Sequence, residues 1–282
     1  MEIISTVADL EKLLSKIPKD KTLGFVPTMG ALHQGHLSLV QQAISENHIC
    51  LCSIFVNPTQ FNNSEDLDQY PNRIEADLKL LKAEGCDIAF TPSKSEIYPS
   101  DFKSKDYNFG SLDKVMEGAN RPGHFKGVAM VVSRLFDLVC PQKAYFGEKD
   151  FQQLAIIKSL VQLDRLPIKI VPCPISREND GLAMSSRNLR LEDRYREAAP
   201  RICQRLLELQ KQLNHKSVEE LKQWMFKEYE ADEDLKLEYF EIANPQTLEK
   251  SIHWTDSQEH IACIALYAGK IRLIDNILLK IN

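Results

Sequence analysis

Two histidines, His33 and His36, stand three residues apart in the segment that follows an apolar run at 22–26. Apolar residues at helical spacing begin at Leu37, so this segment is expected to join a strand to a helix. Three residues make nearly one helical turn, which lets both imidazoles point hydrogen-bond donors at an anion. The helix N-terminus adds unpaired N–H groups and a positive dipole, and Gly35 lets a ligand approach the backbone. The turn is therefore predicted to bind a phosphate group.

Two other interpretations of this turn remain open. A loop with two solvated histidines would show the same residues, and so would part of a metal site. No carboxylate or cysteine accompanies the pair nearby, which disfavours zinc because zinc sites combine several such ligands. The position between a buried strand and an amphipathic helix favours the phosphate interpretation.

A second polar segment, Gly147 to Asp150, follows a short apolar run at 144–146. Lys149 suits a phosphate because its ammonium is a mobile point charge, although a lysine alone would more often lie on the surface. Asp150 is expected to cap the following helix or to bind a ribose hydroxyl, and capping is the commoner fate. Gln153 lies one turn into that helix and can face back toward the same edge.

A third polar segment, DGLAMSSRN (180–188), combines adjacent serines with an arginine. Its hydroxyl, backbone and guanidinium groups could wrap phosphates, and a domain linker that ends in a helix cap is the alternative. Asn57 and Gln60 close a further apolar run. Their uncharged amides suit a small polyhydroxy acid.

The elements that would hold these segments alternate between strands and helices. This alternation predicts βαβ units and a parallel sheet, in which ligands bind outside the carboxyl ends of the strands. The stretch 91–127, rich in Pro, Gly, Ser and charge, is expected to be a long surface excursion. The expected strands are 22–26, 49–56, 87–90, 144–146 and 168–171, and the expected helices are 37–44, 74–83, 128–139 and 152–163.

The pattern changes near residue 175. Two charged amphipathic helices are expected at 192–213 and 217–230, and they precede strand-like runs. Strands grouped after helices suggest a separate α+β domain. The predicted fold class is α/β, with a Rossmann-like doubly wound parallel sheet over residues 1–174 and a smaller α+β domain over 175–282 that closes over the active site. The expected strands of the second domain are 235–243, 259–268 and 271–278.

Composition limits the function further. The chain has 282 residues, 43% hydrophobic and 27% charged, with a net charge of −5 that makes nucleic acid a poor partner. No apolar stretch is long enough to cross a membrane, and the N-terminus lacks the pattern of a secretory signal. The seven cysteines are expected to be reduced core residues of a cytoplasmic protein.

Together the motifs resemble the adenylate-forming nucleotidyltransferase superfamily, marked by a His-x-Gly-His turn and a later Met-Ser-Ser-Arg-Asn loop. Within it the chain resembles the pantothenate synthetase family, also called pantoate–β-alanine ligases. The resemblance extends over nearly the whole chain in the right order. It rests on FVPTMGALHQGH (25–36), SIFVNPTQF (53–61), YPNRIEADLKLL (70–81), EGANRPGHFKGV (117–128), FGEKDFQQL (146–154), DGLAMSSRN (180–188) and RLIDN (272–276).

The resemblance implies an ATP-dependent ligation of (R)-pantoate to β-alanine through a pantoyl-adenylate, with Mg²⁺ and with release of AMP and pyrophosphate. It implies His36 as a candidate general acid, beside His33, Lys149 and Arg187. It also implies pantoate contacts for Gln60, Asn57 and Gln153, with Gln60 contacting β-alanine as well. The ATP-binding residues would be Met29, Gly30, Ala31, Leu32, His33, Gln34, Gly35, His36, Gly147, Glu148, Lys149, Asp150, Ser176, Met184, Ser185, Ser186 and Arg187.

Other expectations are less specific. Asp77 is a candidate Mg²⁺ ligand, with a place on a helix face as the alternative. The polar segment 62–69 could be a lid that excludes water or a solvated loop. The resemblance implies a homodimer, for which the 128–139 helix or the second strand region could supply the interface. Two competing functions remain. One is a nucleotidyltransferase that moves AMP onto a phosphate-bearing acceptor, and the other is a non-catalytic or RNA-binding relative of the class I aminoacyl-tRNA synthetases, which belong to the same superfamily.

Overall fold

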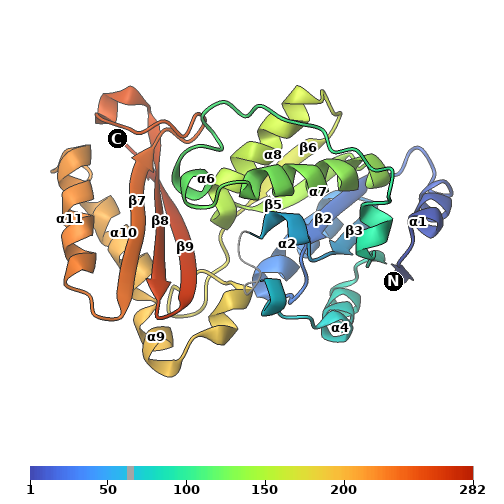
Figure 1. Cartoon of the computed structure of the whole chain (residues 1–282), viewed down its shortest axis with the longest axis horizontal. Coiled ribbons are helices and arrows are strands. Elements are labelled where there is room, and N and C mark those ends of the chain that lie inside the picture. The colour runs from blue at the N-terminus through green and yellow to red at the C-terminus, as the bar shows by residue number, and fades with distance from the viewer. Residues whose placement is uncertain (62–66, 282) are drawn as a thin grey trace.

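The first six strands form one parallel sheet in a computed structural model that describes residues 1–61 and 67–281 (Figure 1). The sheet order is β1-β4-β3-β2-β5-β6. Strand order reverses between β2 and β5, because the chain builds outward from β2 and then returns to its other side. In open α/β sheets ligands bind at such a switch point. The strands are β1 (Glu2–Ile4), β2 (Leu23–Thr28), β3 (Ile49–Ile54), β4 (Ile88–Phe90), β5 (Lys143–Gly147) and β6 (Lys169–Cys173).

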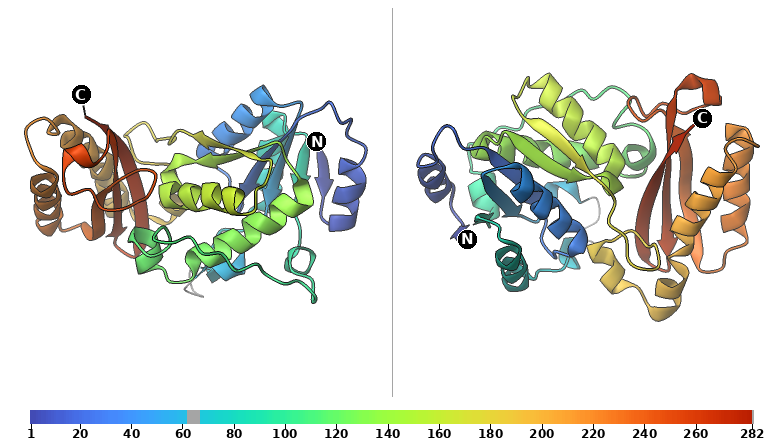
Figure 2. Two further views of the ribbon diagram at one scale, coloured as in Figure 1. Left: turned by 90° about the horizontal axis from the view of Figure 1, so that it is seen from above. Right: turned by 180° about the vertical axis from the view of Figure 1, so that it is seen from behind.

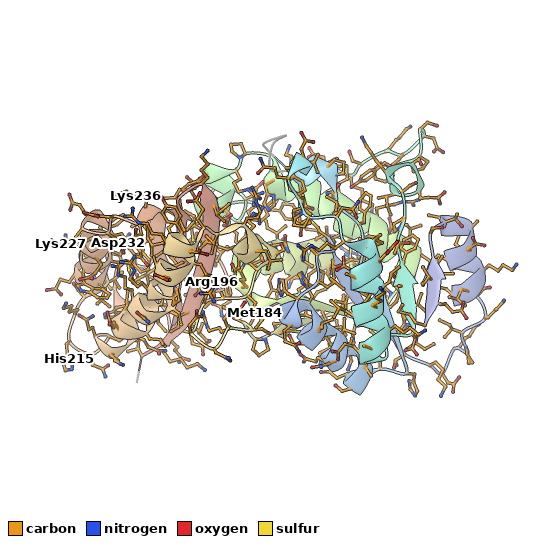
Figure 3. All side chains as sticks on the ribbon, turned by 90° about the horizontal axis from the view of Figure 1, so that it is seen from below. Met184, Arg196, His215, Lys227, Asp232 and Lys236 are labelled. Atoms are coloured by element: carbon orange, nitrogen blue, oxygen red, sulfur yellow. The ribbon has the colours of Figure 1, made fainter. Side chains whose placement is uncertain are left out.

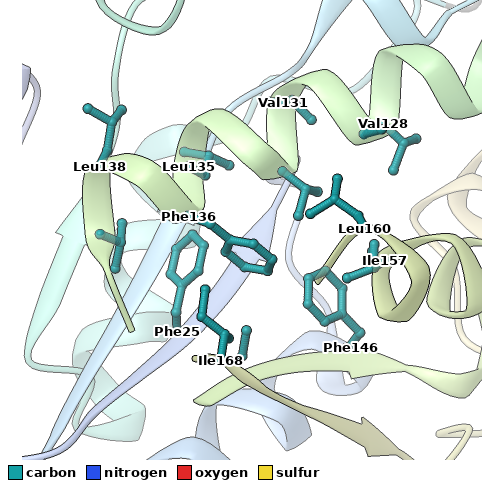
Figure 4. Packing of buried hydrophobic residues seen from close by; sticks show 14 of the residues in the cluster. Phe25, Val128, Val131, Leu135, Phe136, Leu138, Phe146, Ile157, Leu160 and Ile168 are labelled. Carbon is teal, nitrogen blue, oxygen red and sulfur yellow. The ribbon is translucent and has the colours of Figure 1, made fainter. Parts of the chain in front are cut away.

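Helices cover both faces of the sheet, which explains why its central strands are apolar on both sides. Phe25 packs on one face against Phe136, with ring centroids 6.3 Å apart, and Phe136 packs in turn against Phe146 (Figure 4). The adjacent Val26 points to the other face and belongs to a separate cluster with Val40. The first face is covered by α1 (Val7–Leu14), α7 (His124–Val139) and α8 (Phe151–Leu163), and the second by α2 (Gln34–Glu46) and α4 (Ile74–Glu84).

A three-stranded antiparallel sheet makes up the core of the C-terminal part, in the order β7-β8-β9. Two amphipathic helices pack on its outer side, away from the parallel sheet, while β9 faces the first part (Figures 1 and 2). The connection between the two parts carries a short helix, α9 (Asp193–Ala198). The other elements are α10 (Arg201–Lys211), α11 (Val218–Glu230), β7 (Leu235–Ala243), β8 (Glu259–Ala268) and β9 (Ile271–Lys280).

The α/β fold class predicted from the sequence is confirmed. Each expected strand and helix has a counterpart within a few residues, but three details differ. Pro27 lies inside β2 instead of ending it, and the ladder from β2 to β5 stops at Phe25, so this proline has a paired strand on one side only. The helix expected at 192–213 is broken at Pro200, which lacks a backbone N–H and is the N-cap residue of α10. The N-terminal β1 and α1 were not predicted.

The stretch 91–127 holds two short helices, α5 (Lys94–Ile97) and α6 (Met116–Asn120), within its irregular course. All seven cysteines are free, and six are buried as expected, whereas Cys140 is exposed at the end of α7. Most apolar residues of α7 and β3 are buried inside the chain, and the dimer interface suggested for these elements stays a prediction. None of the helices within the described ranges is long and apolar enough to span a bilayer.

Candidate active site

The turn between β2 and α2 lies at the switch point and has an unusual backbone. Gly30 and Ala31 both have positive φ angles, of 80° and 50°. Asp77 of α4 stabilises this conformation, because its two carboxylate oxygens accept the N–H groups of Ala31 and Leu32, each at 2.8 Å. The Asp77 side chain is buried, and it links two segments that lie more than forty residues apart. A carboxylate that accepts two backbone N–H groups holds the turn rigidly.

His33 and His36 cap the N-terminus of α2 with their rings. The His33 Nδ1 accepts the Gly35 N–H at 3.1 Å, and the His36 Nδ1 accepts the His33 N–H at 3.4 Å. Since Nδ1 accepts in both rings, each neutral imidazole carries its proton on Nε2. The rings lie with centroids 4.1 Å apart. The pair therefore presents two N–H donors, as the spacing predicted.

Burial keeps both histidines neutral. Desolvation, helped by the nearby Lys149 ammonium, lowers the pKa of His33 to about 4. Desolvation, with contributions from His33 and Lys149, lowers the pKa of His36 to about 3. Before an anion binds, the two side chains are thus uncharged hydrogen-bond donors at neutral pH. The role of general acid suggested for His36 stays a prediction.

Gly35 leaves room for the His33 ring within the turn. A Cβ at this position would lie 2.9 Å from Cε1 and 3.0 Å from Nδ1 of His33, closer than such atoms approach. The space above Gly35 is thus occupied by the His33 ring. The approach of a ligand to the Gly35 backbone, expected from the sequence, stays a prediction.

Asn57 and Gln60 follow β3, as expected, and both polar atoms of the Asn57 amide have hydrogen-bond partners within the chain. Its Oδ1 accepts hydrogen bonds from Thr59 and from the Tyr98 hydroxyl, and its Nδ2 donates to the carbonyl of Gly127 at 3.0 Å. Nδ2 also donates to Oε1 of Gln60 at 3.2 Å. The Asn57 amide therefore orients Gln60 in this structure.

Gln60 is held from two further directions. Its Nε2 donates to the sulfur of Met29 at 2.9 Å, which places it beside the histidine turn. Its backbone carbonyl hydrogen-bonds the Nδ1 of His124 at 2.8 Å. The second amide and the first polar turn are thus neighbours, as the common sheet edge predicted.

The segment from Gly147 to Asp150 lies at the carboxyl end of β5, on the other side of the switch point. Glu148–Asp150 forms a 3-10 turn (η2) that leads into α8, and the Asp150 side chain makes no cap hydrogen bond, contrary to the commoner expectation. Lys149 is half-buried and lies near both histidines. Gln153 is half-buried beside Lys149 and Asp150 in a small hollow.

The segment 176–188 folds as a hairpin that leads into a 3-10 turn, η3 (Ser186–Arg190). The Met184 N–H donates to the carbonyl of Ser176 at 2.9 Å, and the Ser176 hydroxyl hydrogen-bonds Ser38 of α2 at 3.1 Å. Ser185 caps η3 by accepting the Arg187 N–H at 3.2 Å. Met184 consequently lies at the junction of the two parts of the molecule (Figure 3).

A cavity of about 440 Å³ lies between these segments and the C-terminal sheet. Lys149 and Asp150 line it from the first part, Ser185 and Arg187 from the hairpin, and Arg272 from β9. Because Lys149 is also near the histidines, it connects the cavity to the β2–α2 turn. The three polar segments predicted from the sequence thus surround one region.

The described residues do not form a metal site of their own. No group of three or more His, Cys, Asp or Glu side chains in residues 1–61 and 67–281 could hold a metal ion. The Asp77 carboxylate is engaged by the β2–α2 turn, so its position favours a structural role over the suggested role as a Mg²⁺ ligand. The suggested lid, 62–69, lies largely outside the described residues.

The C-terminal contacts of this region were not predicted. Arg272 of β9 forms hydrogen bonds of 2.9 and 2.7 Å with the buried Glu117 of α6, which also accepts the Tyr239 hydroxyl at 2.8 Å. Both residues lie within motifs recognised in the sequence, EGANRPGHFKGV and RLIDN, but their pairing spans 155 positions. Local spacing does not reveal such a contact.

Comparison with known proteins identifies the family. The family model described as pantoate-beta-alanine ligase matches residues 2–278. The chain belongs to the pantoate-beta-alanine ligase family. This membership confirms the resemblance carried by the motifs, and it places the chain among carbon–nitrogen ligases that join pantoate to β-alanine.

Individual members of the ligase family match over nearly their full length. The pantothenate synthetase of Porphyromonas gingivalis is 48% identical over 278 residues, covering 98% of this chain and 99% of the relative. That of Bacteroides thetaiotaomicron is 48% identical over 281 residues, covering 99% of each. The crystal structure of the Thermus thermophilus enzyme has a TM-score of 0.92 at 41% identity, covering 98% of this chain and 99% of that one.

A further structure bears on ligands of the family. The pantoate-beta-alanine ligase of Francisella tularensis, described as complexed with beta-gamma ATP and beta-alanine, has a TM-score of 0.81 at 36% identity. It covers 99% of this chain and 97% of that chain. The two structures together confirm the fold of this family member.

Proposed function

We propose that this protein condenses (R)-pantoate with β-alanine at the expense of ATP, through a pantoyl-adenylate, and releases AMP and pyrophosphate. The main support is that the three segments predicted to bind phosphate, which are the histidine turn, 147–150 and 180–188, meet at the switch point. The uncharged amide of Gln60 lies beside them. The ATP and β-alanine named for the Francisella tularensis relative are consistent with this. The ATP- and substrate-binding roles of the residues named from the motifs belong to the same proposal.

In the first step a pantoate carboxylate oxygen attacks the α-phosphorus of ATP. The new bond joins that oxygen to phosphorus, and the bond to pyrophosphate breaks with its electron pair leaving on pyrophosphate. Negative charge on the transferring and leaving groups would be stabilised by the Nε2–H donors of His33 and His36 and by the cations of Lys149 and Arg187. Fixed donors of this kind are commonly the largest contribution to catalysis.

In the second step the free amine of β-alanine attacks the acyl carbon of the adenylate. The carbon–nitrogen bond forms, AMP leaves with the electron pair of the acyl–oxygen bond, and the nitrogen releases its extra proton to water. The reactive form is scarce at neutral pH, since a primary amine has a pKa of ~10. In both steps His33 and His36 donate hydrogen bonds without transferring a proton. Neither histidine therefore changes its charge or needs a proton from solvent.

Several finer points rest on the same proposal. Mg²⁺ would enter with the phosphates of ATP, because the described residues offer no cage for it, and Mg²⁺ usually combines few protein ligands with substrate phosphates. Residues 1–174 would form the catalytic domain, and residues 175–282 a domain that closes over it. A homodimer rests on the family resemblance alone, and the free cysteines support a reducing compartment such as the cytoplasm.

Phosphorus NMR tests the proposed reaction. The protein is mixed with ATP, Mg²⁺ and pantoate, with and without β-alanine. Sustained AMP and pyrophosphate formation only with both organic substrates is expected. His36→Ala should lower the rate by on the order of 10²–10³-fold, whereas His48→Ala, at an exposed site at the far end of the sheet, should not.

The competing function predicts a different product. A nucleotidyltransferase would leave AMP attached to a phosphate-bearing acceptor, and it would not respond to β-alanine. Intact ATP in the presence of both organic substrates, or transfer of AMP to an added phosphate acceptor, would refute the ligase assignment.

A further inference from the structure

The RLIDN motif ends in two buried residues of β9, Asp275 and Asn276, to which the proposed reaction assigns no role. Asn276 reaches from the C-terminal sheet to the polar segment after β5. Its Nδ2 donates to the carbonyl of Glu148 at 2.9 Å and to that of Lys149 at 3.0 Å. A carboxamide has two N–H groups, so both contacts can form together. The backbone that carries Lys149 is thus held by a side chain from another part of the molecule.

Asp275 contacts the hairpin at 177–183, which leads to the phosphate-binding segment proposed at 185–187. Its carboxylate accepts two parallel hydrogen bonds from the Arg177 guanidinium, at 2.6 and 2.9 Å. Arg177 in turn donates to the carbonyl of Gly181 at 3.0 Å, at the tip of the hairpin that leads to Ser185. A bidentate pair of this kind fixes orientation as well as distance.

The two residues are also joined to each other. The backbone N–H of Asn276 donates to Oδ1 of Asp275 at 2.8 Å, which orients the carboxylate toward Arg177. Adjacent residues on one rigid strand thereby hold the Glu148–Lys149 backbone and the 177–183 hairpin in a common frame. The spacing between these two segments is set by β9.

We propose that Asp275 and Asn276 are positioning residues that hold the Lys149 and Ser185–Arg187 segments at the spacing that the triphosphate of ATP requires. This inference rests on the proposed use of ATP. Neither side chain needs to touch the nucleotide, because both act on the backbone that presents the phosphate-binding groups. Displacing such groups by about 1 Å can cost on the order of 10²-fold in rate, so loss of the frame should weaken ATP use measurably.

The test is a double-mutant cycle on ATP binding, measured by equilibrium dialysis of labelled ATP with Mg²⁺. Asn276→Asp keeps the side-chain volume but removes both donors, and Asn276→Ser removes them without adding charge. Each should weaken ATP binding about 10-fold while the KM for pantoate changes much less. In a Lys149→Ala background the same substitutions should weaken binding by less than about 2-fold, because Asn276 acts through Lys149.

Two controls separate positioning from general destabilisation. Ser251→Ala removes a buried hydrogen bond of 2.6 Å between the β7–β8 connection and His260 of β8, and it should leave ATP binding unchanged. Asp275→Asn should couple with Arg187→Ala more strongly than with Lys149→Ala. The inference is overturned if the effects of Asn276→Ser and Lys149→Ala multiply, or if Ser251→Ala weakens ATP binding equally.

The proposed function can fail separately. A wild-type protein that binds ATP and shows the coupling, yet forms no AMP with pantoate and β-alanine, would refute the ligation and leave the positioning role in place. Normal ligation with multiplicative effects would overturn only the positioning role. A wild-type protein that does not bind ATP would refute both.

Discussion

Replacing Asp77 with asparagine should destabilise the whole molecule and disable the histidine turn. The substitution keeps the shape of the side chain but turns one acceptor oxygen into an NH₂ group. That group would face the N–H of either Ala31 or Leu32, where donors 2.8 Å apart repel. One charge-assisted hydrogen bond would be lost and a buried N–H left unpaired.

The size of the effect follows from these contacts. A hydrogen bond to a charged group contributes about 1.5–3 kcal/mol, and an unpaired buried donor costs about 1–3 kcal/mol, so we expect a loss of about 3 kcal/mol with partial relaxation. For a domain of this size that loss lowers Tm by roughly 6–12 °C. Because Gly30 and Ala31 would no longer be held at positive φ, kcat/KM should also fall by on the order of 10²-fold.

The assay is thermal unfolding in EDTA, followed by ATP turnover across a Mg²⁺ titration. Glu75→Gln is the matched control, because it neutralises an exposed carboxylate on the same helix and should change stability by less than about 0.5 kcal/mol. If Asp77 were a Mg²⁺ ligand, Asp77→Asn would leave Tm in EDTA unchanged and raise the Mg²⁺ requirement. That pair of results would refute the structural role.

Two further perturbations test the packing around the site. Gly35→Ala should lower kcat/KM about 10-fold, because the added Cβ displaces the His33 ring. It should not lower Tm, because alanine favours the helix more than glycine does. An unchanged kcat/KM would contradict this. Burial lowers the pKa of His124 from 6.5 to about 4, so between these two pH values the side chain takes up a proton when the protein unfolds. The free energy of unfolding therefore falls as the pH falls through that range. His124→Asn should therefore reduce the dependence of unfolding free energy on pH near pH 5 by about 1.4 kcal/mol per unit, as measured by urea unfolding; the same change from His48→Asn would argue against this assignment.

The strands and the polar segments after them could be predicted because their signals are local. A buried strand is marked by a continuous apolar run, and a turn after it by glycine and polar residues within about ten positions. The parallel sheet then brings distant segments to one edge, so the ends of β2, β3 and β5 could be grouped without knowing any contact. This inference placed the histidine turn, Gln60 and Lys149 in one region.

The contacts that fix these segments could not be predicted in the same way. Asp77 binds a turn 46 positions earlier in the chain, and Asn276 binds carbonyls 127 and 128 positions earlier. Asp77 and Asn276 are single polar residues in an ordinary helix and an ordinary strand. A solvent-exposed position on either element would commonly carry the same type of residue. Only the three-dimensional structure distinguishes the two, which is why the sequence alone leaves Asp77 open as a metal ligand.

The neutral state of the histidines ties the fold to the proposed chemistry. If His33 and His36 were charged, the free enzyme would hold two buried cations beside Lys149, and their mutual repulsion would oppose the compact turn. As neutral rings, both histidines accept backbone N–H groups at Nδ1, which holds the turn, and they still present Nε2–H to an incoming phosphate. The pantoate-dependent exchange of pyrophosphate into ATP measures the first step. Its kcat/KM should not fall between pH 8 and pH 6, where a histidine of ordinary pKa would take up a proton. A decline of tenfold with a midpoint near pH 6.5, absent from His36→Asn, would show instead that a protonation change at His36 is required for catalysis.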